Sequence, residues 1–332
     1  MQVTFVNVGY GDAILLQMPD GYTALLDGGS ALNREFDGDP HRIRCIDYLR
    51  AVGIRHLDAV WISHIHEDHV CGLEPILQQV SVGRLYVPYP IEPFVQGRAL
   101  RAGEDVPRSV PLYVEALNAY QRIICRAREA NIPVQVVQAG DELKLSKGLI
   151  VRVLAPREAV VRAYIKLIHM CYSGEDDAPT TLLTQLDSIS NRTSLLLRIE
   201  AEGMTFLAAA DSCPSEWEDI SKNLLKNVNV LKLPHHGQKD SISEHFMRNI
   251  PLRYVITTSA SDRRYHSSNP WVYEQLSSWY PPDKCPRFLF TDERSYPPYF
   301  SQPDGFQAIT LVINSGEIFP EFVKFNYEGE LQ

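Results

Sequence analysis

The residues best suited to chemistry in this 332-residue chain are histidines and carboxylates that cluster in short segments. The densest cluster is His64-Ile-His-Glu-Asp-His69, which contains three imidazoles and two carboxylates. Neutral imidazole is the commonest protein ligand of first-row divalent metals, and carboxylates complete such ligand sets. Alternate side chains of a tight loop can bind one metal ion while the following pair binds a second. The spacing therefore predicts two divalent cations, with zinc favoured and manganese and iron as alternatives.

Further ligand types recur later in the chain, again next to predicted strands. His235-His236 and His266 each lie at or shortly after a strand end, and Asp211 ends another strand. Two metal ions about 3.5 to 4 Å apart can activate water and hold the oxygens of a phosphoryl or acyl centre. A metal-dependent hydrolase is therefore the function that these residues favour.

Short strands position the cluster. Residues 3–8, 13–17 and 22–26 are β-branched or aromatic runs separated by turns, and a helix follows at residues 43–52. The apolar run 58–63 predicts a buried strand that leads directly into His64. In layered α/β proteins, ligands bind where loops gather at the carboxyl ends of strands. Further strands are predicted at residues 134–137, 143–145, 149–154, 194–199, 204–209, 228–233, 252–257, 288–290, 308–313 and 322–325.

Two segments interrupt this series and are interpreted as insertions. Residues 87–131 are rich in proline, glycine and charge and then form an amphipathic helix. Residues 157–191 begin as a helix, but the Gly, Pro, Ser and Thr content of residues 173–191 is typical of a mobile loop that covers a site. With no internal repeat or clear linker, we expect one domain over residues 1–332.

Composition narrows the class of protein. Apolar residues make up 45% and charged residues 22%, which is typical of a soluble globular chain. The net charge of −9 argues against a broad basic surface for nucleic acid, although a metal pair can itself attract a phosphate. The sequence has no signal peptide pattern and no run long enough to cross a membrane, so we expect a cytoplasmic protein. The six cysteines form no CxxC pair, which favours reduced thiols over a zinc-thiolate site.

The segment from His64 to His69 matches the HxHxDH signature, and the chain resembles the metallo-β-lactamase superfamily of hydrolases. Within it, the chain is most similar to the hydrolase domain of the ComEC-type competence proteins, the bacterial DNA-uptake channels. The segments that carry this resemblance are Asn7-Val-Gly-Tyr-Gly-Asp-Ala13, Leu25-Leu-Asp-Gly-Gly29, Asn191-Arg-Thr-Ser194 and Leu231-Lys-Leu-Pro-His-His-Gly237. The resemblance implies an α/β fold, a four-layer αββα sandwich that covers nearly the whole chain.

The resemblance also implies roles for individual residues. His64 and His66 bind one metal ion, Asp68 and His69 bind the second, and Asp211 bridges the two. Asp68 in addition handles the proton of the attacking water. Asp27 corresponds to a carboxylate that lies beside the ligands and orients one of their imidazoles.

The later histidines have less definite roles in the resemblance. One residue of the pair His235 and His236 faces the metal ions, and the other binds substrate or supports the loop. As a working assignment, His235 is placed among the ligands and His236 among the catalytic residues. His266 is the nearest candidate for the last ligand, although Ser267 or Asn269 could occupy that position instead.

Three functions are consistent with the sequence. The leading hypothesis is a phosphodiesterase or nuclease that acts on a phosphodiester or nucleic-acid substrate. The second keeps the metal ions but cleaves a carboxylic ester, lactone or thioester. The third is a non-catalytic binding module with a degenerate metal site, which is motivated by the irregular stretch at residues 265–270.

Overall fold

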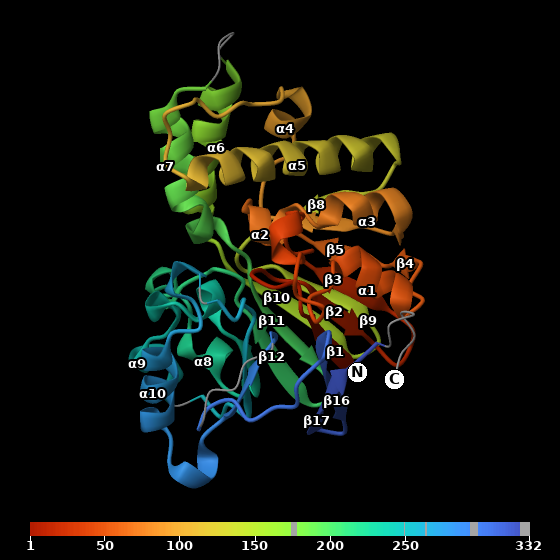
Figure 1. Ribbon diagram of the computed structural model, residues 1–332, viewed down its shortest axis with the longest axis vertical. Helices are drawn as coiled ribbons and strands as arrows, with labels where there is room; N and C mark the ends of the chain where they lie inside the picture. Colours follow the sequence, from red (N-terminus) through yellow and green to blue (C-terminus); the bar gives the residue numbers. More distant parts are fainter. Residues whose placement is uncertain (174–177, 249, 263, 293–297, 326–332) are drawn as a thin grey trace.

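Two β-sheets form the centre of the computed structural model, which describes residues 1–173, 178–248, 250–262, 264–292 and 298–325 (Figure 1). The first sheet has the spatial order β17 (Glu317–Val323), β16 (Ala308–Asn314), β1 (Gln2–Val6), β2 (Ile14–Gln17), β3 (Thr23–Leu26), β5 (Ala59–Trp61), β7 (Leu85–Val87) and β8 (Val134–Val136). The second has the order β15 (Arg287–Phe290), β14 (Tyr254–Thr257), β13 (Val230–Lys232), β12 (Met204–Ala208), β11 (Leu196–Ala201), β10 (Leu149–Ala155) and β9 (Glu142–Ser146). Strands β4 (His56–Leu57) and β6 (Ser81–Val82) form a small separate pair.

Alternation along each strand explains why both sheets are buried on both faces. In β2, Ile14 and Leu16 enter the core between the sheets, whereas Leu15 enters the core under the helices. In β13, Val230 enters the same central core and Leu231 the outer core on the opposite side. Three apolar cores therefore separate four layers, and the predicted αββα arrangement is confirmed.

Helices cover both outer faces of the paired sheets (Figure 1). The helices packed on the first sheet are α1 (Cys45–Ala51), α2 (Glu67–Val70), α3 (Leu73–Gln79), α4 (Glu92–Gln96), α5 (Ser109–Glu129), α6 (Glu158–Ser173) and α7 (Thr180–Ser190). Those packed on the second are α8 (Lys222–Leu225), α9 (Glu244–Met247) and α10 (Pro270–Trp279). We call helices α4 to α7 the helical cover.

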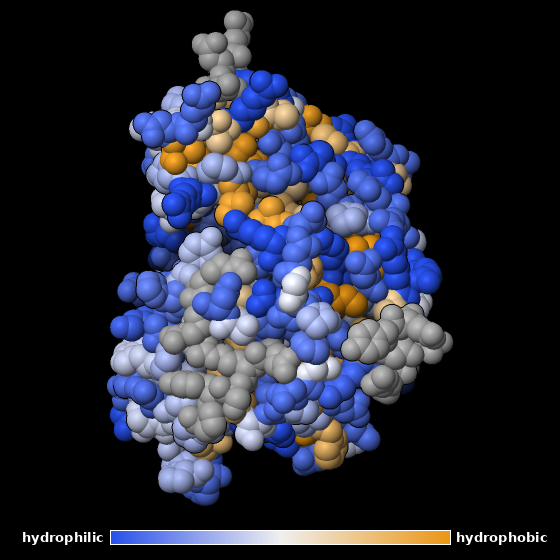
Figure 2. Space-filling view, viewed as in Figure 1, coloured by the Kyte–Doolittle hydropathy of each residue, from blue (hydrophilic) through white to orange (hydrophobic). Residues whose placement is uncertain are grey.

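The helical cover corrects one prediction. Residues 180–190 form helix α7, so the mobile loop expected over residues 173–191 is wrong for this part, and residues 174–177 lie outside the described residues. Leu182, Leu183 and Leu186 are buried in the core under the first sheet's helices, which outweighs the loop-like composition. Figure 2 shows that the visible face is mainly hydrophilic, with hydrophobic side chains gathered mostly over this cover.

The carboxyl ends of several strands meet at one rim of the two sheets. Strands β3, β5 and β7 are parallel neighbours in the first sheet, and β12, β13, β14 and β15 are parallel neighbours in the second. Loops that leave parallel strands at the same end are the usual place for a ligand site. Among the residues that the structure describes, no helix has the length and apolar character needed to cross a bilayer.

Candidate metal centre

A close contact between the backbones of the loop after β1 and the loop after β5 holds the histidine loop in place. The amide of Asp12 donates to the carbonyl of Asp68 over 3.1 Å, which joins the loop after β1 to the histidine loop. A Cβ atom on Gly11 would lie 2.3 Å from that carbonyl oxygen, and the φ of Gly11 is +140°. Only glycine satisfies both conditions, so the Gly-Tyr-Gly-Asp segment is needed to hold the histidine loop in place.

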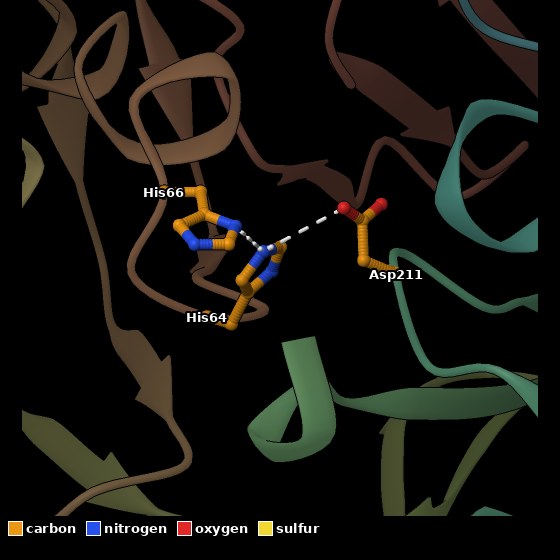
Figure 3. A group of neighbouring side chains, drawn as sticks. All are labelled: His64, His66 and Asp211. Carbon is orange, nitrogen blue, oxygen red and sulfur yellow. Dashed lines mark hydrogen bonds and ion pairs between the residues drawn. The ribbon is translucent and has the colours of Figure 1, made fainter. Parts of the chain in front are cut away.

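Three side chains form what we call the outer group: His64, His66 and Asp211 (Figure 3). His64 Nε2 lies 3.1 Å from His66 Nδ1 and 3.9 Å from Asp211 Oδ2. His66 turns its Nε2 toward helix α7, where it lies 3.3 Å from Asp187 Oδ1. The histidines come from the loop after β5, and Asp211 comes from the loop after β12 in the other sheet.

Three further side chains form the inner group: Asp68, His69 and His236. His69 Nε2 lies 3.3 Å from His236 Nε2, and Asp68 Oδ2 lies 3.0 Å from the same nitrogen of His236. Asp211 Oδ1 lies 3.3 Å from Nε2 of each of the two histidines. Asp211 therefore directs one carboxylate oxygen to each group, as a bridging ligand would.

Hydrogen bonds behind the rings determine which nitrogens are free to bind a cation. His236 Nδ1 donates to the carbonyl of Thr258 over 2.7 Å, and His69 Nδ1 donates to Asp27 Oδ2 over 2.8 Å. Because a neutral imidazole carries one N–H, each ring then presents a bare Nε2 to the other at 3.3 Å. Two facing lone pairs repel unless a cation lies between them, so the inner group fits a metal ion.

The outer group has the same property. Ser63 Oγ donates to Asp27 Oδ2 over 2.6 Å and accepts from His64 Nδ1 over 3.0 Å. His66 donates its Nε2 proton to Asp187, which leaves His66 Nδ1 bare and opposite the bare Nε2 of His64. Asp211 Oδ1 is in addition buried with no hydrogen-bond donor among the described residues. The residues present therefore fit two divalent cations that share Asp211.

Burial and charge shift the ionisation of these groups. Burial, together with the neighbouring His69 and His66, lowers the pKa of His64 well below its usual value, so this ring stays neutral as a ligand must. Burial opposes charge on His69 as well, but Asp211 and Asp68 outweigh it and raise the pKa of His69, so without a metal ion its Nε2 holds a proton that a bound cation would replace. Burial raises the pKa of Asp211, but His236 and His69 lower it by more, so its pKa lies well below the usual range. The carboxylates thus favour positive charge between the histidines.

Asp27 lies behind the ligands and not among them. It is 2% exposed, and its two oxygens accept from the amide and hydroxyl of Ser63 over 2.8 and 2.6 Å. The second of these oxygens also accepts from His69 Nδ1. This geometry is compatible with the predicted orienting role, because a carboxylate on the far nitrogen fixes both the tautomer and the angle of a ligand imidazole.

Sequence reasoning missed a buried ion pair below the centre. Lys232 is fully buried, and its Nζ lies 2.6 Å from Asp12 Oδ2, 2.9 Å from the carbonyl of Ala210 and 4.0 Å from Asp211 Oδ1. Asp12 also accepts from Thr258 Oγ1 over 2.5 Å. The signal in the sequence is a lysine within the apolar run 230–233, where a charged side chain needs a buried partner.

The structure reverses the working assignment of the paired histidines. His236 is fully buried within the inner group, whereas His235 points away from it and lies 3.0 Å from Asp240 Oδ2. Both residues have positive φ angles, +47° and +52°, so the chain turns sharply between strand β13 and the next loop. This turn sends consecutive side chains in different directions, which the sequence does not indicate.

His266 is not brought to either group. It is exposed in a turn where its φ is +60°, and the following Ser267 and Ser268 point inward instead. Ser267 Oγ accepts from Ser259 Oγ over 2.7 Å, and the Ser268 amide donates to the carbonyl of His236 over 2.9 Å. The turn therefore supports the His236 loop through its backbone and does not supply the predicted last imidazole.

A cleft of about 300 Å³ opens onto the centre. Asp68, Asp211 and His66 line its floor, and side chains from the helical cover form one wall. The wall residues from that cover are Ser109, Leu112, Tyr113 and Asp187. The opposite side carries His235, Gln238, Tyr10 and Tyr265, with Arg34 and Glu35 also in the lining. The size suits a small organic substrate or one residue of a polymer.

Comparison with known proteins agrees with this architecture. Residues 6–138 match the model of the metallo-beta-lactamase superfamily. This match and the two packed sheets confirm the resemblance predicted from the sequence and show that the chain has the metallo-β-lactamase fold. The matched segment contains the histidine loop, whereas Asp211 and His236 lie beyond it.

Relatives and solved structures extend the comparison along the chain. ComE operon protein 3 of Bacillus subtilis (strain 168) is 25% identical over 288 residues, which cover 83% of this chain and 30% of that protein. This chain thus spans less than a third of its relative's length. Zinc-bound PqqB from Methylobacterium extorquens has a TM-score of 0.45 and 11% identity, covering 87% of this chain and 97% of that chain. A diphosphatase from the PhnP family has a TM-score of 0.41 and 14% identity, covering 85% and 92%.

Proposed function

We propose that this chain is a hydrolase that uses two divalent metal ions, bound by the outer and inner groups, to cleave phosphodiester bonds. The observation that carries the proposal is the pair of imidazole contacts at 3.1 and 3.3 Å, each with bare nitrogens and each beside one oxygen of Asp211. Metal ions held there would lower the pKa of bound water and would neutralise charge on both the attacking and the leaving oxygen.

Asp68 is the carboxylate placed to accept a proton. Its Oδ2 contacts both His69 and His236, yet its side chain is 16% exposed and lines the cleft, so it reaches the centre and the substrate space together. His69 and His236 keep the pKa of Asp68 well below its usual range, despite burial, which maintains the anion. An ionised carboxylate at this point orients water for attack and receives its proton.

Two other cleft residues are suited to bind a phosphodiester. The Arg34 side chain is 57% exposed, and although its Nε lies 3.6 Å from Glu35 Oε1, its terminal nitrogens can donate to phosphate oxygens. Tyr265 is 53% exposed and packs 5.3 Å from the ring of Tyr10, so it offers an aromatic face at the cleft. Such a face can stack on a nucleobase.

The degenerate-site alternative rested on the irregular stretch at residues 265–270. Each of the two groups contains three potential ligands without His266, because His236 lies in the inner group, and this supports an intact metal site. The acyl alternative uses the same metal ions, so the ligand geometry does not distinguish it from the phosphodiester proposal. Only an assay with both kinds of substrate does.

The test combines metal content with turnover of paired substrates. Protein purified without chelator is assayed by elemental analysis and then with bis-p-nitrophenyl phosphate and p-nitrophenyl acetate. We expect at least two bound metal ions and turnover of the phosphodiester, lost in His66→Ala and kept in His245→Ala, a control that removes an exposed imidazole on α9. Turnover of the acetate alone would support the acyl alternative, and failure to bind metal would refute the hydrolase.

A further inference from the structure

A third group of potential ligands lies beside the cleft and belongs to neither metal group. It consists of Cys213, His235 and Asp240, whose ligating atoms all lie within 4.8 Å of one another. His235 Nδ1 is 3.9 Å from Cys213 Sγ and 3.0 Å from Asp240 Oδ2. Cys213 follows β12, whereas His235 and Asp240 lie five positions apart in the segment between β13 and α9, so the fold brings Cys213 to the other two residues.

We propose that Cys213, His235 and Asp240 form a third divalent-cation site, selective for zinc, next to the catalytic cleft. A thiol, an imidazole and a carboxylate are the three side-chain types that bind zinc most often. Zinc bonds of about 2.0 to 2.3 Å at tetrahedral angles place neighbouring donor atoms roughly 3.3 to 3.6 Å apart. The measured separations of 3.0 and 3.9 Å lie on either side of that range, so binding needs only small side-chain movements.

The site is chemically distinct from the metal pair. The inner and outer groups contain only imidazole and carboxylate ligands, whereas this group contains sulfur, which favours zinc over magnesium or calcium. Asp240 is 55% exposed, so a cation can enter from solvent and keep water in its fourth position. A search of the sequence for CxxC pairs could not reveal this site, because Cys213 and His235 are separated by 22 positions.

His235 connects this site to the cleft. Its other ring nitrogen, Nε2, lies 3.1 Å from the side-chain amide of Asn191 and 2.9 Å from that of Gln238, and all three residues line the cleft. A neutral imidazole that binds a cation through Nδ1 must carry its proton on Nε2. Zinc binding would therefore make His235 a hydrogen-bond donor toward the cleft.

Asn191 provides an acceptor for that proton. Its Oδ1 is buried and makes no hydrogen bond within the described part of the chain, while its amide nitrogen faces His235. The oxygen and nitrogen of a side-chain amide are interchangeable by a half-turn. That half-turn, together with the same rotation of the Gln238 amide, would direct oxygen acceptors at His235 Nε2, which is favourable only when Nε2 is protonated.

Cobalt(II) titration tests the site without relying on activity. Thiolate bound to cobalt gives a charge-transfer absorption in the near ultraviolet, and neither ligand set of the metal pair can produce it because they lack sulfur. We expect this band in the native chain, its loss in Cys213→Ser with one fewer bound metal ion, and its weakening in Asp240→Asn. Cys285→Ser, which removes a partly exposed thiol elsewhere, should keep the band.

Each outcome separates this site from the proposed function. Cobalt bound with only the visible bands of nitrogen and oxygen ligands would overturn the third site and leave the metal pair intact. A thiolate band that persists in Cys213→Ser would also overturn it, because the sulfur would come from another cysteine. A thiolate band with no additional cobalt bound by the inner and outer groups would support the third site and count against the hydrolase.

Discussion

The inner and outer groups bind through the same residue types but are supported by different parts of the molecule. In the inner group, His69 and His236 are fully buried and are held by Asp27 and the carbonyl of Thr258, which belong to the two sheets. In the outer group, His66 is 18% exposed and is held by Asp187 of helix α7. One half of the centre is thus fixed by the sheets, and the other depends on how the helical cover docks.

The largest effect should come from breaking the buried ion pair between Lys232 and Asp12 below the metal centre. Lys232→Met leaves the buried Asp12 side chain without its 2.6 Å partner, and removing one member of such a pair costs about 3 to 5 kcal/mol of stability. Urea unfolding of the metal-free protein measures this loss. Since the pair also holds the Ala210 carbonyl next to Asp211, the variant should bind both metal ions more weakly.

A double variant separates the missing charge from disrupted packing. Adding Asp12→Asn to Lys232→Met removes the uncompensated carboxylate, so it should recover part of the lost stability. If the double variant is less stable than Lys232→Met alone, the buried charge is not the cause of the loss.

An intermediate effect should come from replacing the carboxylates that hold the ligand imidazoles, Asp27 for the inner group and Asp187 for the outer group. Asp27→Asn weakens the hydrogen bond behind His69, whereas Asp187→Asn weakens only one of two contacts behind His66 Nε2, which also lies 3.3 Å from the Asp187 carbonyl. Such changes lower metal affinity about 10- to 100-fold, and Asp187→Asn should have the smaller effect. Competition with a chelator measures the affinity of each variant. Only Asp27→Asn should also lower thermal stability, because Asp27 is 2% exposed and anchors Ser63, whereas Asp187 is on a surface helix. Equal losses of stability would refute the contrast.

The smallest effect should come from loosening the helical cover. Tyr113 of α5 and Tyr164 of α6 share a buried hydroxyl contact of 2.5 Å, and Tyr164→Phe leaves the Tyr113 hydroxyl without that partner. The expected cost is about 1 kcal/mol. Hydrogen exchange followed by mass spectrometry should show faster exchange in α5 to α7 and no change in β5 or β12. Faster exchange in those strands would mean that cover and sheets open together.

Much of this arrangement could be predicted from spacing and alternation alone. The run 58–63 predicted a strand that delivers His64, and the structure gathers His64, His66, Asp68, His69 and Asp211 as the resemblance implied. These residues follow strands whose carboxyl ends share a rim, so strand order is enough to bring them close. Their roles in binding metal stay predictions.

The remaining features depend on the directions in which side chains point, which a sequence does not specify. The order of His235 and His236 follows from two consecutive positive φ angles, and the outward position of His266 follows from a third. Helix α7 has a loop-like composition and is stabilised by burial of its leucines. Asp187 was missed for that reason, since a carboxylate in a predicted loop gives no sign that it will reach His66.

Strand β1 lies between β2 and β16, so the first strand of the chain takes one of its two neighbours from residues 308–314. During synthesis on the ribosome, β1 emerges long before β16, and its backbone N–H and C=O groups on that side stay unpaired until residues 308–314 have been made. The first sheet should therefore be completed only after residues 308–314 emerge and not progressively from β1, and ribosome-bound chains that lack these residues should need chaperones to avoid aggregation.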